Sequence, residues 1–276
     1  FNADGSLNES SNYTMFVWIP RYAYKITYYN ADKSQVIGYS NSDGITDVNG
    51  KIQEGTEKEG AIEIGDKYVL HPAFNYGNSN ENKLRGFWVG KYETSHTGCT
   101  TTASTGQTNT TTPIAQIKAG VTSWRGISVN NIYTVCTEMN KSGNPYGLST
   151  SDSIIDPHMM KNSEWGAVAY LSKSKYGKET EEVWINNSGS YITGSAGNSV
   201  SAAADIGTTN DYTSTQGVGA STTGNVYGVY DMSGGAYEYV AAYINNENGN
   251  LTEYGSSLVN GDPKTKNVYA SGSGDT

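Results

Sequence analysis

The sequence has few cysteines, and their spacing argues against a metal-binding or redox motif. The 276 residues include two, Cys99 and Cys136. They have no CxxC spacing and no histidine pair beside them, so the pattern does not favour a structural zinc site. An oxidising compartment would allow a disulfide between them. Two unpaired thiols are the alternative, and both stay open because spacing alone cannot distinguish them.

Long apolar runs and basic clusters are missing as well. No run approaches the roughly 20 apolar residues that span a bilayer, and no signal peptide is visible, so we expect no membrane span and a mature or trimmed chain. The 27 acidic side chains outnumber the 18 basic ones, which gives a net charge of −9. Nucleic-acid phosphates would be repelled by this charge, so no nucleic-acid partner is expected.

Motifs for hydrolytic catalysis are also absent. The three histidines have no recognisable serine or cysteine nucleophile motif nearby, and no GxSxG occurs. His71 precedes Pro72 and is interpreted as a turn or core residue. The adjacent Glu181 and Glu182 are read as solvated charges on a loop, and no carboxylate pair points to a glycosidase.

Small polar residues and tyrosine are abundant instead. The chain has 33 glycines and 22 tyrosines. Glycine, serine and asparagine form turns and hydrogen-bonding loops, and tyrosine provides a large contact area at little entropic cost. This composition is typical of a loop-rich binding protein.

The hydrophobic pattern predicts one α+β domain with two main helices, many short strands and long loops. We expect a strand over 16–26 that is broken at Pro20, strands over 67–70 and 84–95, helices over 124–139 and 159–172, ordered loops over 176–224, and a polar tail over 245–276. Ser123 is the expected cap of the first helix. Four tryptophans, Trp18, Trp88, Trp124 and Trp165, fall in these elements and are expected in the core.

Four segments, in order, resemble the formylglycine-generating-enzyme (sulfatase-modifying factor) family. Residues 87–95 (FWVGKYETS) resemble its F-x-M-G-x-x-E-V-T strand, and residues 121–126 (VTSWRG) resemble its V-S-W-x-D-A helix entry. Residues 162–169 (NSEWGAVA) resemble T-E-A-E-W-E-Y-A-A. The most specific segment, residues 225–240 (NVYGVYDMSGGAYEYV), follows N-x-Y-G-L-Y-D-M-S-G-N-V-W-E-W-V.

The resemblance implies a C-type-lectin-like fold. Residues 67–276 would form this domain, truncated or differently built at its C-terminal end, and residues 1–66 would form a strand and loop extension packed on it. Enzymes of the family carry their catalytic cysteine pair in a late segment, and no cysteine follows Cys136. We therefore expect a non-catalytic version, of the kind that bacterial surfaces and phages display. The alternative of a formylglycine-generating oxidase would need that pair.

The resemblance also implies a calcium site in the glycine turn. The carbonyl groups of Ser233, Gly234 and Ala236 and the carboxylate of Glu238 would be its ligands. Calcium takes six to eight oxygens, so loop atoms or water would complete the set. The alternative is a glycine turn in which Glu238 accepts local hydrogen bonds.

The expected function is extracellular recognition or adhesion. Loops rich in tyrosine, serine and asparagine would be presented to a protein or glycan ligand on a cell surface. Aromatic residues in polar loops are the candidate contacts: Trp184, Tyr212, Tyr243 and Tyr254. The alternative is a structural subunit of a pilus, phage tail or other surface assembly, with strands paired between copies. Either function implies an extracellular, cell-surface or virion-surface location.

Overall fold

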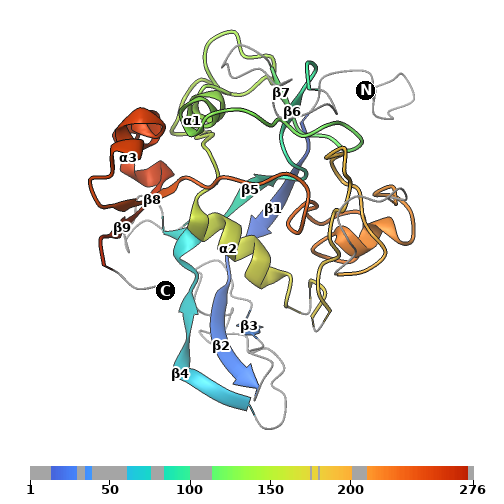
Figure 1. The fold of residues 1–276 in the computed structure, drawn as a ribbon. Helices are drawn as coiled ribbons and strands as arrows, with labels where there is room; N and C mark the ends of the chain where they lie inside the picture. Colours follow the sequence, from blue (N-terminus) through green and yellow to red (C-terminus); the bar gives the residue numbers. More distant parts are fainter. Residues whose placement is uncertain are drawn as a thin grey trace.

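The chain folds into a mixed α and β structure with small sheets (Figure 1). The computed structural model describes residues 14–29, 35–38, 61–75, 84–99, 114–174, 176–179, 181–200 and 210–272. Within these ranges lie four α-helices: α1 (Val129–Thr137), α2 (Asn162–Leu171), α3 (Gly249–Glu253) and α4 (Ser256–Asn260). The two longer helices, α1 and α2, overlap the two predicted ones. The prediction of helices combined with many short strands is confirmed.

A two-stranded antiparallel sheet lies at the centre of the fold. Strand β1 (Phe16–Pro20) pairs with β5 (Gly86–Gly90), and Trp18 lies opposite Trp88. Successive side chains of a strand point to opposite faces. One face of the pair therefore carries Ile19 and Val89, which are buried, and the other carries the two tryptophans, which are exposed.

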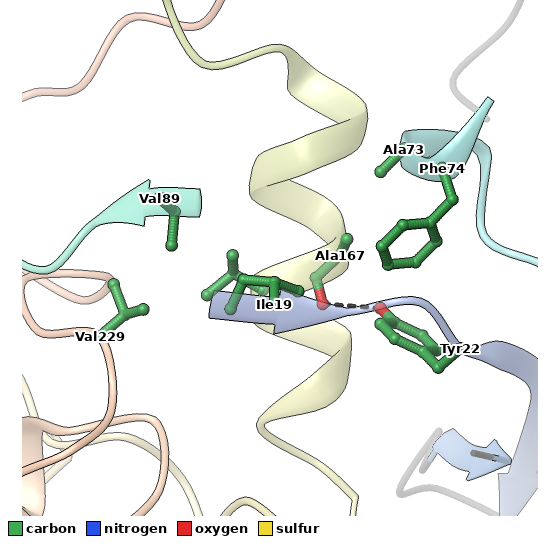
Figure 2. Packing of buried hydrophobic residues seen from close by; sticks show 8 residues of the cluster. Ile19, Tyr22, Ala73, Phe74, Val89, Ala167 and Val229 are labelled. Atoms are coloured by element: carbon green, nitrogen blue, oxygen red, sulfur yellow. Dashed lines mark hydrogen bonds between the residues drawn. The ribbon is translucent and has the colours of Figure 1, made fainter. Parts of the chain in front are cut away.

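Helix α2 covers the buried face of this sheet (Figure 2). Ala167 and Val168 of the helix pack with the strand residues, with Val229, and with Phe74 of the short helix η1 (Pro72–Phe74). Lys161 is the N-cap residue of the helix, and the carboxylate of Glu164 in the first turn accepts its backbone N–H over 2.9 Å. Leu171 also packs against this core, which anchors α2 on the sheet.

A second sheet extends away from the centre in the order β3-β2-β4 (Figure 1). Its strands are β2 (Ala23–Tyr29), β3 (Gln35–Gly38) and β4 (Ala61–Leu70), and all pair antiparallel. The expected domain boundary between residues 66 and 67 lies inside β4. Much of the predicted extension over residues 1–66 lies outside the described residues.

The first helix begins later than predicted. Helix α1 is capped by Ser128, whose hydroxyl accepts the N–H of Asn131 over 3.4 Å. The predicted cap, Ser123, donates its hydroxyl to the carboxylate of Glu93 instead. The expected start at Trp124 is therefore wrong. Ser123 bonds to a residue far away in the sequence, and the local sequence pattern does not reveal such a partner.

Residues 245–272 of the predicted polar tail form short helices and a strand. They contain α3, α4, the short helix η5 (Pro263–Thr265) and strand β9 (Asn267–Ala270). Strand β9 pairs in parallel with β8 (Ala242–Asn245). Leu258 of α4 joins Tyr133 and Met159 in a separate hydrophobic cluster, which holds the tail against α1.

Two further short strands, β6 (Ser95–His96) and β7 (Ala115–Gln116), pair near the loop that precedes α1. In the described part of the chain, no helix is both long and apolar enough to cross a membrane.

His71 is a buried core residue, as its position before Pro72 predicts. Its Nδ1 accepts the N–H of Ala73 over 3.3 Å and so caps η1. The rings of Tyr22, Tyr24 and Tyr170 surround it, with centroids 5.0–5.7 Å away. Burial lowers the pKa of His71 to about 4, because its surroundings disfavour the charged form.

Acid is therefore expected to destabilise the fold through His71. Its folded pKa lies below the unfolded value near 6.5, so unfolding takes up a proton between those two pH values. The stability that neutral His71 provides is present above pH 6.5 and is lost as pH falls towards 4, by about 3 kcal/mol. Urea unfolding from pH 7 to pH 4 measures this loss.

The His71→Asn variant is the matched control, because asparagine keeps a cap acceptor and does not titrate. The variant is expected to be less stable at pH 7 and to lose less stability over the same pH range. The carboxyl groups titrate in both proteins, so their contribution cancels when the unfolding free energy of the variant is subtracted from that of the wild type at each pH. Parallel pH curves would contradict the prediction.

Candidate functional site

The four segments that carry the family resemblance meet at one place in the fold. Glu93, which follows β5, accepts a hydrogen bond from Ser123 and another from the N–H of Ala236, the latter over 2.9 Å. Trp165 of α2 donates its indole N–H to Glu238 over 3.0 Å. Segments whose contacting residues are up to 143 positions apart in the sequence are thereby joined through polar side chains.

The glycine turn is shaped to receive Glu93. Gly234 and Gly235 have φ angles of +79° and +73°, a backbone conformation that residues with a Cβ rarely adopt. A Cβ on Gly235 would clash with Oε1 of Glu93. Glycine at 235 therefore permits both the turn and the close approach of the carboxylate.

Asp231 is fully buried and holds several loops together. Its carboxylate accepts the side-chain amide of Asn186 over 2.8 Å, the N–H of Gly194 over 2.9 Å and the N–H of Glu93 over 3.2 Å. Its φ angle of +64° is one that aspartate tolerates better than most residues. Asp231 thus sets the positions of both Glu93 and the loop at 186–194.

Three carboxyl groups, Glu93, Asp231 and Glu238, form what we call the carboxylate cluster. Burial raises the pKa of Asp231 to about 6, against the lowering effect of its hydrogen bonds. Burial and the charge of Asp231 raise the pKa of Glu93 well above its usual value. Glu238 as a whole residue is exposed, but its carboxyl group is buried, and this burial raises its pKa to about 7. The hydrogen bond from Trp165 lowers the pKa of Glu238, and the charge of Asp231 raises it.

The predicted calcium ligands are close in space, but two of them already have hydrogen-bond partners. The carbonyl of Ser233 accepts the N–H of Asn186 over 2.7 Å, and the carboxylate of Glu238 accepts the indole of Trp165. Gly234 forms a bridge with Asn186. A carbonyl oxygen has a second lone pair and can still bind a cation. Among the described residues, no group of three or more His, Cys, Asp or Glu side chains could hold a metal ion. That finding does not test a site built on carbonyl groups, so calcium stays a prediction.

Next to the carboxylate cluster lies a cleft of about 1840 Å³. Its wall contains many aromatic rings: Phe16, Trp18, Trp88, Trp124, Trp165, Tyr191, Tyr237 and Tyr239. We call it the aromatic cleft. Glu93 and Glu238 of the carboxylate cluster line it too, so apolar rings and polar oxygens share one concave surface.

Several of these rings are open to solvent. Trp88 is 63% exposed and Tyr239 is 60% exposed, and Tyr237 is fully exposed. Trp18 is 42% exposed and contacts Trp88, with ring centroids 5.2 Å apart. The expectation that Trp18 and Trp88 lie in the core is therefore wrong. Strand alternation turns them away from the face that α2 covers. Trp124 is buried as expected, and Trp165 is half-buried in the cleft wall.

The predicted ligand contacts lie elsewhere. Trp184 packs against Gly219 of the short helix η4 (Gly217–Ala220), and Tyr212 packs on the rings of Tyr92 and Tyr230. Tyr243 lies in β8 beside the cluster formed by α1 and α4, with Lys266 over its ring. Tyr254 is exposed at the end of α3. None of these four residues lines the aromatic cleft.

The aromatic residues that do line the cleft carried a signal in the sequence. Tyr237 and Tyr239 alternate on either side of Glu238 just after the glycine turn, and Trp18 and Trp88 alternate with apolar residues in their strands. The alternation predicts that they share a face. Whether that face is covered depends on what packs against the strand, and that is a tertiary property.

The wall of the cleft also contains a network of ionisable side chains, His158, Lys161 and Glu164. His158 lies 3.1 Å from the carboxylate of Glu164, and Lys161 lies 3.2 Å from it. The other ring nitrogen of His158 is 2.7 Å from the carbonyl of Asp156. Burial lowers the pKa of His158, but Glu164 and the carbonyl outweigh it, so the net shift is upward. This network holds the loop before α2 against the helix.

The two cysteines are free thiols in this structure. Burial raises the pKa of Cys136 to about 12.

Comparison with protein-family models, with curated proteins and with solved structures gives no match. The resemblance to the formylglycine-generating-enzyme family therefore stays a prediction.

Proposed function

We propose that the chain is a non-catalytic extracellular recognition domain whose aromatic cleft binds a protein or glycan ligand on a cell surface. The proposed fold is C-type-lectin-like, of the formylglycine-generating-enzyme type. The meeting of all four resembling segments around Glu93 and Glu238 supports this proposal. The lack of a late cysteine pair supports a non-catalytic role.

The observation that carries the proposal is the set of exposed rings in the cleft. Water-exposed tryptophan and tyrosine that cluster in a concave surface are typical of binding sites, because their burial by a ligand is favourable. Trp88, Tyr237 and Tyr239 meet that description. Tryptophan and tyrosine are also the residues that dominate measured binding energies at protein interfaces.

Binding to arrayed glycans and to arrayed surface-protein ectodomains tests the proposal. For any ligand found, Trp88→Ala is expected to lower the affinity about 10- to 100-fold, since a large exposed ring of the cleft wall is lost. Tyr227 is 79% exposed and lies outside the cleft wall, so Tyr227→Ala is the matched control and is expected to bind normally. Both variants should melt near the wild-type temperature. Equal affinity of wild type and Trp88→Ala would contradict the cleft as the binding site.

Calcium is proposed as a structural ion of the glycine turn. If it binds there, calcium at about 100 times its Kd stabilises the fold by about 3 kcal/mol, which raises Tm by about 5–10 °C in a protein of this size. Melting in calcium and in chelator measures this, with Glu238→Gln as the variant that should lose the shift. The same Tm in both buffers would contradict calcium and favour the turn in which Glu238 only accepts hydrogen bonds.

An assembly subunit is the second candidate. In the described residues β9 pairs on one edge with β8, and Ile244 and Val268 of these strands are about half exposed. An open strand edge beside exposed apolar side chains can pair with another copy. Light scattering after size-exclusion chromatography tests it. A concentration-dependent oligomer that Val268→Lys disrupts would favour this function, and a monomer at all concentrations would contradict it.

A further inference from the structure

We infer that the aromatic cleft receives a positively charged side chain, arginine or lysine, from a partner protein. The inference rests on the proposed recognition function and names the chemistry of its ligand. Three features of the described residues carry it. Exposed rings line the cleft together with Glu238, the charged groups that act on Glu238 are carboxylates, and the cations of the cleft wall already have partners within the protein.

The first feature is that a carboxylate and exposed rings line the same cleft. Glu238 lines it together with its chain neighbours Tyr237 and Tyr239, which are exposed, and the indole N–H of Trp165 donates to one of its oxygens over 3.0 Å. An aromatic face attracts a cation through its quadrupole, and a carboxylate beside it adds a charged hydrogen-bond acceptor. A guanidinium or ammonium group can use both at once, and its hydrocarbon stem can lie along the apolar wall.

The second feature is charge. Burial and the charge of Asp231 both raise the pKa of Glu93 and of Glu238, so the ionised forms of these neighbouring carboxyl groups disfavour one another through charge repulsion. In the described part of the chain, the charged groups that shift the pKa of Glu238 and Glu93 are all carboxylates. A cationic ligand would relieve this repulsion, whereas a neutral sugar would leave it in place.

The third feature is that the cations of the cleft wall have other partners. Lys161 pairs with Glu164 over 3.2 Å. Lys264 lies 3.6 Å from Asp156 and 3.5 Å from Asp262. Arg125 stacks on the ring of Tyr191, with its guanidinium carbon 4.0 Å from the centroid. This stack shows that an arginine fits against a ring of this wall, and a ligand arginine would repeat that contact beside Glu238.

The test compares two short peptides that differ in one charge. Acetyl-Gly-Arg-Gly-amide carries a guanidinium group, and acetyl-Gly-citrulline-Gly-amide has nearly the same shape without the charge. Tryptophan fluorescence and the indole N–H signals in NMR spectra report binding to the cleft. Titrations are made in chelator, because calcium would compete for Glu238.

We expect the arginine peptide to bind about tenfold more tightly than the citrulline peptide and to weaken as salt is added. Glu238→Gln should bring the arginine peptide to the affinity of the citrulline peptide, with Tm within a few degrees of wild type. Glu182→Gln, which removes a carboxylate outside the cleft wall, is the matched control and should not change binding.

Equal affinity for the two peptides, no binding of the arginine peptide, or wild-type affinity in Glu238→Gln would overturn the inference. A neutral glycan that binds and depends on Trp88 would also overturn it, but would leave the recognition function standing. If no arrayed ligand depends on Trp88 and neither peptide binds, the recognition function itself fails.

Discussion

Replacing Asp231 by alanine is expected to destabilise the fold by about 3–5 kcal/mol, which is a large part of the stability of a typical domain. The carboxylate is fully buried and accepts hydrogen bonds from Asn186, Gly194 and Glu93. Alanine would leave these buried donors without an acceptor, and each such loss costs about 1–3 kcal/mol.

Two variants separate the causes of this effect. Asparagine tolerates the left-handed backbone at 231 and has the same size, so Asp231→Asn isolates the loss of acceptor capacity. Asp211→Ala is the control for removing an aspartate: Asp211 is exposed and accepts local hydrogen bonds from Thr213, so its loss should cost about 1 kcal/mol or less. Urea unfolding gives all three free energies. A cost for Asp231→Ala no larger than that for Asp211→Ala would contradict the role of Asp231.

Replacing Tyr22 by alanine is expected to cost about 3–5 kcal/mol, because it removes a fully buried ring from the centre of the core. The ring meets Phe74 edge to face with centroids 5.4 Å apart. Its hydroxyl donates to the carbonyl of Ala167 in α2 over 2.6 Å (Figure 2). Tyr22 therefore joins the end of β1 to both helices that pack on the sheet.

Tyr22→Phe is the matched control for this second variant. It keeps the ring and removes only the hydroxyl group, so the carbonyl of Ala167 loses one hydrogen bond and the expected cost is about 1 kcal/mol. Thermal melting or urea unfolding measures both variants. Equal losses for Tyr22→Ala and Tyr22→Phe would mean that the hydrogen bond, and not ring packing, supplies the stability.

Local pattern predicts those elements whose residues are constrained by near neighbours. Helix α2 lies within its predicted range because Glu164 bonds back to the N–H of Lys161 three residues earlier. The start of α1 is mispredicted because Ser123 is engaged by Glu93, 30 residues away. The same distinction explains His71, whose role as a turn residue follows from the adjacent Pro72.

The sequence likewise predicts some residues of the candidate site and misses others. The sequence points to Glu238 through the specific segment at 225–240, and glycine at 234 and 235 indicates a turn. It does not reveal that Glu93, Ser123 and Trp165 complete the surroundings, since hydrogen bonds between segments far apart in the chain join them. The four predicted aromatic contacts lie outside the cleft, because a polar neighbourhood in sequence does not tell which ring another segment covers.

By itself, the sequence determined the mixed α and β class, the position of α2, the glycine turn and the acidic charge of the chain. These depend on residue type and short-range periodicity, which are local properties. Tertiary structure alone decided that Trp18 and Trp88 face solvent, that Asp231 is buried with three donors, and that rings and carboxylates share one cleft. The physical reason is that burial and pKa depend on every segment that packs around a side chain, and such contacts are made across the chain and not along it.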